Sequence, residues 1–361
     1  METPQSPREQ KQQSSSKRFL KISLQIVFMV AIFAALLWYV GIGSLYDALL
    51  TIKVEYLVLA FLMYFGINLL FTVRLRRVLG KSGVKTSFGK TLLAQYAGML
   101  TSDVTPGRSG YILMPVYLRD QNVPASKGLS TILGIQTIEF LVKVVGGVGA
   151  VIYLVTFVSA ETWNQMFPQA FMGVNLGIIV AALGITLMLV GAIVLALFTW
   201  SKRAISLFDK IANSRYLRRF TGGLMGKLEE YKQSSHSTRC AIPEISILTF
   251  ACWILKGFEW WFLGLALGIT YVPWIAYFLI HPLVTALAFV PITPAGAGVQ
   301  EFGIIGILGL LGVAVGPAGA FALLARGLLI FMDFIGIPQI VKSTGLVFSR
   351  KKPLETSLPA Q

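Results

Sequence analysis

Ionisable side chains interrupt the apolar runs of this 361-residue sequence and are the first candidates for chemistry. Each would cost roughly 2.5–3.5 kcal/mol at the centre of a membrane-spanning helix, so it persists only if it pairs, lines a hydrated cavity or carries a function. The set comprises Glu139, Lys143, Lys256, Glu259, Glu301, Arg326 and Asp333, with Asp103 and Arg108 in a polar interruption between two apolar segments.

Four of these charges form two pairs, in which a residue of opposite sign lies one helical turn away. Glu139 precedes Lys143 by four residues, and Lys256 precedes Glu259 by three. Either spacing places both groups on one helix face. Self-neutralised structural pairs and a polar path through a helix bundle both remain open.

Glu301 and Arg326 lack such local partners. Glu301 follows the glycine-rich segment 293–298, in the first turn of a helix expected to begin near Val299. The helix dipole alone stabilises a carboxylate there by about 0.3–1 kcal/mol at exposed sites. Arg326 has no carboxylate three or four residues away, so its partner must be tertiary. The preferred site is a Glu301–Arg326 pair beside a broken helix.

The interruption TPGRSG, residues 105–110, combines glycine flexibility with a guanidinium. Backbone N–H groups at a helix start, together with Arg108, are typical of a phosphate cradle. A plain turn before a short helix is the alternative. His281 precedes Pro282 inside an apolar run, where a polar residue at a kink is favoured over a proton-linked group.

Composition decides which elements position these residues. Hydrophobic residues make up 55% of the chain, charged residues 13%, and the mean hydropathy is +0.72. A soluble domain has about 25% charged residues, so an ordinary soluble enzyme is excluded. The long continuous runs predict an all-α, polytopic membrane bundle of about seven spans rather than a barrel. The apolar runs are 22–40, 56–73, 128–158, 174–198, 245–269, 274–290, 299–315 and 318–341.

Short apolar segments surround both glycine-rich interruptions. Segments 88–101 and 111–118 are too short to cross a bilayer and predict re-entrant or discontinuous helices. Segments 274–290, 299–315 and 318–341 fit three crossings, or one crossing after a re-entrant pair. Residues 105–110 also resemble 293–298, which is consistent with a two-fold internal repeat or with two unrelated loops.

Basic residues are segregated along the chain, whose formal charge is +15. Of 31 Lys and Arg residues, 24 lie in segments 1–21, 74–90, 201–240 and 342–361, whereas 159–172 has none. The positive-inside rule then predicts an inner-membrane protein with both termini cytoplasmic, and anionic lipid headgroups as partners. No nucleic-acid motif is present. The expected organisation is a disordered tail 1–18, a membrane domain 19–345 with a basic interfacial helix over 201–240, and a flexible tail 346–361.

Signatures of common enzymes are missing from the sequence. Gly89-Lys90-Thr91 is close to a phosphate-binding loop, but Val84 occupies the position of its first glycine. Neither G-x-S-x-G nor H-E-x-x-H occurs. Two histidines and two cysteines twelve residues apart indicate neither a metal site nor a disulfide. We therefore expect no enzyme activity, cofactor or metal.

The two interruptions carry a family resemblance. PGRSG at 106–110 followed by Glu139, and PAGAGVQE at 294–301 followed by Arg326 in LLARGLL, resemble the lysylphosphatidylglycerol synthase transmembrane-region family. This is the flippase-like membrane domain of multiple peptide resistance factors, and the resemblance covers most of 19–341. The soluble aminoacyl-transferase domain has no counterpart here, which implies a stand-alone membrane domain without lipid synthase activity.

The resemblance implies movement of a lipid or lipid-linked headgroup between leaflets. Arg108 would meet phosphate, and Glu301 with Arg326 would line or gate a groove. The implied substrate-binding set is Gly107, Arg108, Gly110, Glu139, Pro294, Gly296, Gly298, Glu301 and Arg326, and the implied partners are anionic or polyprenyl-linked lipids. Assembly with further copies of the chain is left open by the sequence. The sequence departs from the family pattern at Tyr111 and Met114, where an acidic and a basic residue are usual, and at Gln136 and Thr137, which replace a Glu-Arg pair.

Alternative functions remain open at this point. The same broken helices suit a secondary transporter of a small anionic or amphiphilic solute. A membrane-embedded enzyme or a non-catalytic accessory protein of lipid or glycan assembly, and a structural membrane organiser, are further alternatives.

Overall fold

The fold is described from a computed structural model. It describes residues 34–349, except 36, 106, 167–169, 172–173, 202–224, 288, 290–292 and 294–295. The expected tail 1–18, most of the expected span 22–40, most of the basic segment 201–240 and residues 350–361 lie outside this set, as does Pro294.

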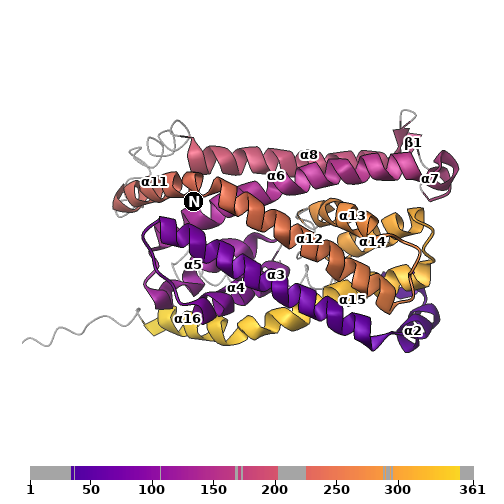
Figure 1. The fold of residues 1–361 in the computed structure, drawn as a ribbon, viewed down its shortest axis with the longest axis horizontal. Coiled ribbons are helices and arrows are strands. Elements are labelled where there is room, and N and C mark those ends of the chain that lie inside the picture. The colour runs from indigo at the N-terminus through magenta and orange to yellow at the C-terminus, as the bar shows by residue number, and fades with distance from the viewer. Residues whose placement is uncertain are drawn as a thin grey trace, which may run out of the picture.

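Helices make up nearly all of the described chain, which confirms the all-α polytopic prediction (Figure 1). The N-terminal half contains α2 (Ile42–Leu50), α3 (Val54–Lys81), α4 (Phe88–Asp103), η1 (Ser109–Leu113), α5 (Met114–Tyr117), η2 (Arg119–Gln121), α6 (Ala125–Phe157) and α7 (Ala160–Met166). The rest contains α8 (Leu176–Trp200), α11 (Met225–Cys240), α12 (Ile242–Ala266), α13 (Trp274–Leu287), α14 (Val299–Leu310), α15 (Val315–Asp333), η3 (Phe334–Gly336) and α16 (Ile337–Ser349). Two-residue strands β1 (Ala170–Phe171) and β2 (Val174–Asn175) pair antiparallel.

Helix length separates crossing helices from re-entrant ones. Five apolar stretches of the described chain are long enough to span: Val54–Lys81, Ala125–Phe157, Gly177–Trp200, Ile242–Ala266 and Val315–Ser343. Helices α13 and α14 have 14 and 12 residues, or about 21 and 18 Å at 1.5 Å per residue. Both fall short of a hydrocarbon core about 30 Å thick. Of the two arrangements left open for the C-terminal part, these lengths agree with one crossing after a re-entrant pair.

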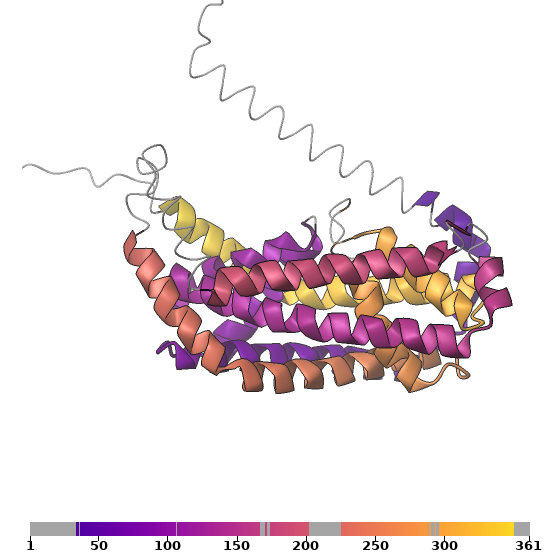
Figure 2. The same ribbon diagram turned by 90° about the horizontal axis from the view of Figure 1, so that it is seen from above.

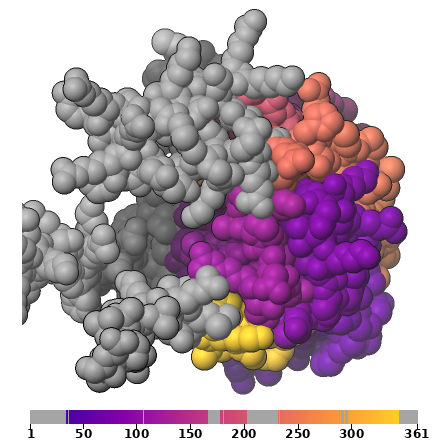
Figure 3. Space-filling model, turned by 90° about the vertical axis from the view of Figure 1, so that its left-hand side faces the viewer, coloured from indigo at the N-terminus to yellow at the C-terminus, as the bar shows by residue number. Residues whose placement is uncertain are grey.

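The helices α3 and α12 run antiparallel and define two ends of the molecule. Lys53 N, before α3, donates to the Ala266 carbonyl at the end of α12 (2.9 Å). At the other end of the pair, Lys81 bonds Glu244 at 2.9 Å. We call the end with Lys81 the basic end, because Lys127, Arg239 and Lys342 also lie there. Figure 3 views the molecule from this end.

Two broken hairpins enter the bundle from these two ends. Hairpin 1 comprises α4, η1 and α5 (residues 88–117), and its base at the basic end is closed by a bond from Ser87 N to Gln121 Oε1 (2.8 Å). Hairpin 2 comprises α13 and α14 (residues 274–310), and its base is closed at the opposite end, where Tyr271 donates to the Gly312 carbonyl (3.1 Å). Side chains from both hairpins, among them Arg108 and Gln300, line one cavity inside the molecule.

The same order of elements occurs twice in opposite directions. A long helix, a short helix, a break, a short segment and a long helix follow one another in α3–α6 and again in α12–α15. Since α3 and α12 are antiparallel, the two units are related as in inverted-repeat transporters. This arrangement supports the internal repeat suggested by residues 105–110 and 293–298.

Packing is concentrated between the hairpins and the long helices around them. Buried side chains such as Tyr64, Leu263 and Phe321 form the larger core, and a second cluster with Met114 and Ile132 lies toward the basic end. Helices α6 and α8 lie side by side along one edge (Figures 1 and 2), and α8 exposes large apolar side chains there, among them Leu183. Exposed apolar surface on a helix that is apolar all round is typical of contact with lipid.

Candidate functional site

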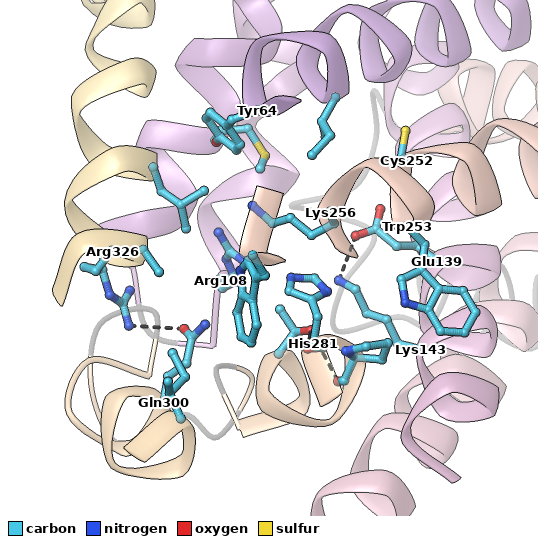
Figure 4. A pocket seen from close by; sticks show the side chains of 18 of the residues that line it. Tyr64, Arg108, Glu139, Lys143, Cys252, Trp253, Lys256, His281, Gln300 and Arg326 are labelled. Atoms are coloured by element: carbon cyan, nitrogen blue, oxygen red, sulfur yellow. Dashed lines mark hydrogen bonds and ion pairs between the residues drawn. The ribbon is translucent and has the colours of Figure 1, made fainter. Parts of the chain in front are cut away.

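A cavity of about 100 Å³ lies where the two hairpin tips meet (Figure 4). At about 10–15 Å³ for each water, it holds roughly seven to ten waters or a small polar group. Seven helices and the turn with Arg108 contribute to its wall. The polar side chains among the lining residues are Tyr64, Arg108, Glu139, Lys143, Thr249, Lys256, His281, Thr285, Gln300, Glu301 and Arg326. Of the nine site residues expected from the sequence, Arg108, Glu139, Glu301 and Arg326 line this cavity.

Hairpin 1 contributes Arg108 to the cavity. Arg108 and Gly107 both have positive φ (55° and 58°), so the chain turns sharply and directs the guanidinium inward. Arg108 Nη2 bonds Asp103 Oδ1 at 2.6 Å, and Asp103 is the last residue of α4. The pair is therefore held within one hairpin.

The backbone amides of hairpin 1 do not form the predicted phosphate cradle. The Arg108 N–H donates to the Thr105 carbonyl, and the Gly110 N–H donates to Thr105 Oγ1 at 2.7 Å. A Cβ on Gly110 would lie 2.3 Å from the Thr101 carbonyl oxygen, so this glycine permits close packing of η1 on α4. The prediction was wrong for these N–H groups because Thr105 already satisfies them. Gly107 and Gly110 shape the turn and do not line the cavity.

Hairpin 2 contributes Gln300 and Glu301. Gly298, at φ 84°, precedes the first turn of α14, and its N–H donates to Glu301 Oε2 at 2.6 Å. Glu301 Oε1 accepts from Arg326 Nε on α15 at 2.5 Å. The expected pair is thus present, and the same carboxylate also caps the helix, so the two accounts of Glu301 are both correct. Gly296, at φ 68°, belongs to the same turn, and Pro294 lies outside the described residues.

The Lys143–Glu139 and Lys256–Glu259 pairs form as their spacing predicts. Lys143 Nζ lies 2.8 Å from Glu139 Oε1, and Lys256 Nζ lies 2.6 Å from Glu259 Oε2. Glu259 is fully buried behind the cavity wall, whereas both lysines reach the cavity (Figure 4). Each amine can therefore meet a bound group while its carboxylate stays in place.

Sequence reasoning missed Arg74. The expected span 56–73 ended just before it and assigned it to a basic interfacial segment, but α3 continues to Lys81. Arg74 is 1% exposed and bonds Glu139 Oε2 at 3.1 Å. The sequence did not separate Arg74 from Arg76 and Arg77, because the polar face of Tyr64, Asn68 and Thr72 continues at a spacing of four to Arg76 and not to Arg74.

Two other groups lie near the cavity in roles the sequence left open. Asp333 accepts a hydrogen bond from Tyr64 at 2.9 Å rather than pairing with an arginine. His281 faces the cavity at the proline-containing helix α13, and its ring packs edge-on against Trp260 with centroids 4.8 Å apart. A polar residue at a kink is what the sequence favoured.

Cations outnumber carboxylates at the cavity surface. Four basic side chains face it, namely Arg108, Lys143, Lys256 and Arg326, against two carboxylates, Glu139 and Glu301. Each of the four is also paired with a carboxylate, and two of these, Asp103 and Glu259, lie outside the cavity lining. The lining itself is therefore more positive than the site as a whole and suits an anion. Within the described residues, no group of three potential His, Cys, Asp or Glu ligands could hold a metal ion.

Comparison with known proteins agrees with this architecture. The model of the lysylphosphatidylglycerol synthase TM region matches residues 26–336. The chain belongs to this family. A UPF0104 membrane protein of Pyrococcus horikoshii is 22% identical over 323 residues, which cover 84% of this chain and 90% of that protein. Like the rest of the lysylphosphatidylglycerol synthase TM family, the chain is therefore a multi-pass membrane protein.

Proposed function

We propose that this protein moves an anionic lipid, or a lipid-linked anionic headgroup, between the two leaflets of a membrane. The observation that supports this most directly is the cation-rich cavity between two hairpins that enter from opposite ends. A polar headgroup crosses the hydrocarbon core only if protein groups replace its water. Arg108, Lys143 and Lys256, which line the cavity between the hairpins, supply such groups.

The two hairpins give the cavity two distinct approaches. The base of hairpin 1 lies at the basic end and the base of hairpin 2 at the opposite end, so in this proposal each hairpin covers the approach to the cavity from its own end. Alternating access requires that one hairpin moves away from the cavity while the other stays in place. The Glu301–Arg326 pair, which joins α14 to α15, is the gate on the side of hairpin 2.

The basic end is assigned to the cytoplasm under the positive-inside rule. The cell membrane is the proposed location, and the missing phosphate-binding loop leaves downhill or ion-coupled transport as the energy source. No residue is assigned a catalytic role, since the cavity's charged groups are paired with one another rather than aligned around a nucleophile.

Proteoliposomes test this function directly. Purified protein is reconstituted with lipids whose headgroup carries a fluorophore, and a membrane-impermeant quencher reports the fraction that has reached the outer leaflet. We expect faster exchange of an anionic phospholipid than of a zwitterionic one, and no acceleration with Arg326→Leu. Movement of an entrapped soluble anion without lipid exchange would favour a solute transporter instead.

A further inference from the structure

A second, smaller chamber adjoins the main cavity. It has a volume of about 40 Å³, which is room for roughly three or four waters. Its wall consists of Phe71, Arg74, Met99, Ser102, Arg108, Tyr111, Gln136, Glu139, Lys143 and Phe289. Half of these residues also line the main cavity, so the two spaces are neighbours.

The chamber lies on the side of the basic end. Helix α3 runs toward that end, and Arg74 is ten residues beyond Tyr64 of the main cavity, or about 15 Å along the helix. Helix α6 starts at the basic end, and Gln136 of the chamber precedes Lys143. The chamber is therefore the part of the site nearest the proposed cytoplasmic face.

The charges around the chamber do not balance. Arg74 and Lys143 share a single carboxylate, Glu139, whose two oxygens each accept one of them. Arg108 is paired with Asp103, so three cations face two carboxylates. Asp333, a further buried carboxyl group, lines neither space and is bonded to Tyr64. Asp333 also interacts electrostatically with Arg108 and Asp103, so the excess of positive charge belongs to the side chains that line the chamber, where Arg74, Arg108 and Lys143 stand against Glu139.

Unpartnered donors remain beside the chamber. Arg74 uses Nη1 for Thr249 and Nη2 for Glu139, but its buried Nε has no partner among the described residues. The side-chain oxygen of Gln95 accepts a hydrogen bond from Tyr111. The buried amide nitrogen of Gln95 has no partner among the described residues. Buried donors without partners are rare in native structures, and Arg74 lies directly in the chamber wall.

We propose that the chamber is a second anion subsite and that the ligand carries a diphosphate, with one phosphoryl group in the main cavity and the other in the chamber. Arg108 and Lys143 line both spaces and would contact both groups. Two anionic groups that share the same arginine and lysine must lie close together, as the two phosphoryl groups of a diphosphate do. A phosphodiester headgroup has only one phosphoryl group. This inference rests on the proposed function and names the substrate class of that site.

Binding of defined probes to the detergent-purified full chain tests the subsite without any transport step. The probes are geranylgeranyl diphosphate and geranylgeranyl monophosphate, with inorganic pyrophosphate and orthophosphate as the lipid-free pair. Titration calorimetry should give at least about tenfold tighter binding of the prenyl diphosphate than of the prenyl monophosphate. The chain length is the same in both, so only the second phosphoryl group is compared.

Gln136→Glu places a negative charge in the chamber wall and leaves the main cavity unchanged. We expect the preference for the diphosphate to fall about tenfold or more, while monophosphate binding stays within about twofold of the unaltered protein. Arg74→Lys, which keeps the charge but removes Nε, should lower only diphosphate binding. The matched control is Gln233→Glu on the exposed face of α11, which should change neither.

The outcomes separate this inference from the proposed function. Equal binding of mono- and diphosphate, or equal loss of both with Gln136→Glu in protein that elutes as a folded species, overturns the subsite. Inorganic pyrophosphate that binds as tightly as the prenyl diphosphate overturns a lipid as the source of the ligand. Selective diphosphate binding without lipid movement in proteoliposomes supports the subsite and contradicts the flippase function.

Discussion

The two broken hairpins place opposite charges at the same cavity and anchor them differently. Hairpin 1 presents Arg108, held by Asp103 five residues earlier in the same hairpin. Hairpin 2 presents Glu301, held by Arg326 on another helix, 25 residues later. A ligand can therefore compete for Arg108 without separating two helices, whereas breaking the Glu301 pair uncouples α14 from α15. Hairpin 1 is suited to binding and hairpin 2 to gating.

The local anchoring of the two tips differs in a parallel way. In hairpin 1 the side chain of Thr105 holds the turn, because its Oγ1 accepts a hydrogen bond from the Gly110 N–H. In hairpin 2 the functional carboxylate itself does so, because Glu301 bonds the Gly298 N–H. Removal of the Glu301 charge would thus disturb both the pair and the start of α14, while removal of the Arg108 charge would leave its turn intact.

The largest effect is expected for Arg326→Leu. It leaves Glu301 buried without its cation, which typically costs about 3–5 kcal/mol, and it should abolish lipid exchange. Thermal unfolding in detergent and the proteoliposome assay measure the two effects. The double variant Glu301→Gln/Arg326→Leu should recover most of the stability and none of the transport; if it recovers transport, Arg326 is a structural partner and the gate is wrongly assigned.

Gly110→Ala should have the next largest effect on stability. The added Cβ would lie 2.3 Å from the Thr101 carbonyl oxygen, so the backbone of hairpin 1 must shift, at a cost of roughly 1–3 kcal/mol. Gly80→Ala is the matched control, since nothing lies within 4 Å of a Cβ there, and alanine is the better helix former. Equal melting temperatures for the two variants would contradict the tight packing of η1 on α4.

The double variant Asp103→Asn/Arg108→Gln should weaken transport and leave the fold almost unchanged. Both residues lie within hairpin 1, where the turn is held by Thr105, and removing both charges leaves no buried carboxylate without its cation. Loss of one charge-assisted contact to an anion is worth about 1.5–3 kcal/mol, or a roughly tenfold or greater fall in the exchange rate at low lipid fraction. The comparison of hairpins fails if this variant unfolds as readily as Arg326→Leu.

The opposite entry of the hairpins can be checked by labelling alone, without a measurement of activity. In a background where Cys240 and Cys252 are replaced by serine, Ser87→Cys and Tyr271→Cys each mark the base of one hairpin. An impermeant maleimide applied to intact cells should label residue 271, and residue 87 only after permeabilisation. Labelling of both residues from one side would contradict the inverted relationship of the two units.

Local periodicity explains why much of this molecule could be predicted. Long apolar runs identify α6, α8 and α12, and short runs around glycine identify both broken hairpins, because hydrophobicity and glycine act over a few residues. The pairs Glu139–Lys143 and Lys256–Glu259 follow from helical spacing. The Glu301–Arg326 pair needed only the further argument that an isolated buried arginine requires a distant carboxylate.

Tertiary structure alone decided the remaining contacts. Arg74 joins Glu139, and Asp333 meets Tyr64, because antiparallel and re-entrant helices bring residues 65 and 269 positions apart into contact. The folded hairpin also decided that Thr105 accepts a hydrogen bond from a backbone N–H group that the sequence had suggested for phosphate binding. The sequence determined by itself that charges would lie within the membrane, since their energetic cost is local. Which charges face one another depends on the direction in which each helix enters, and only the packed bundle fixes that direction.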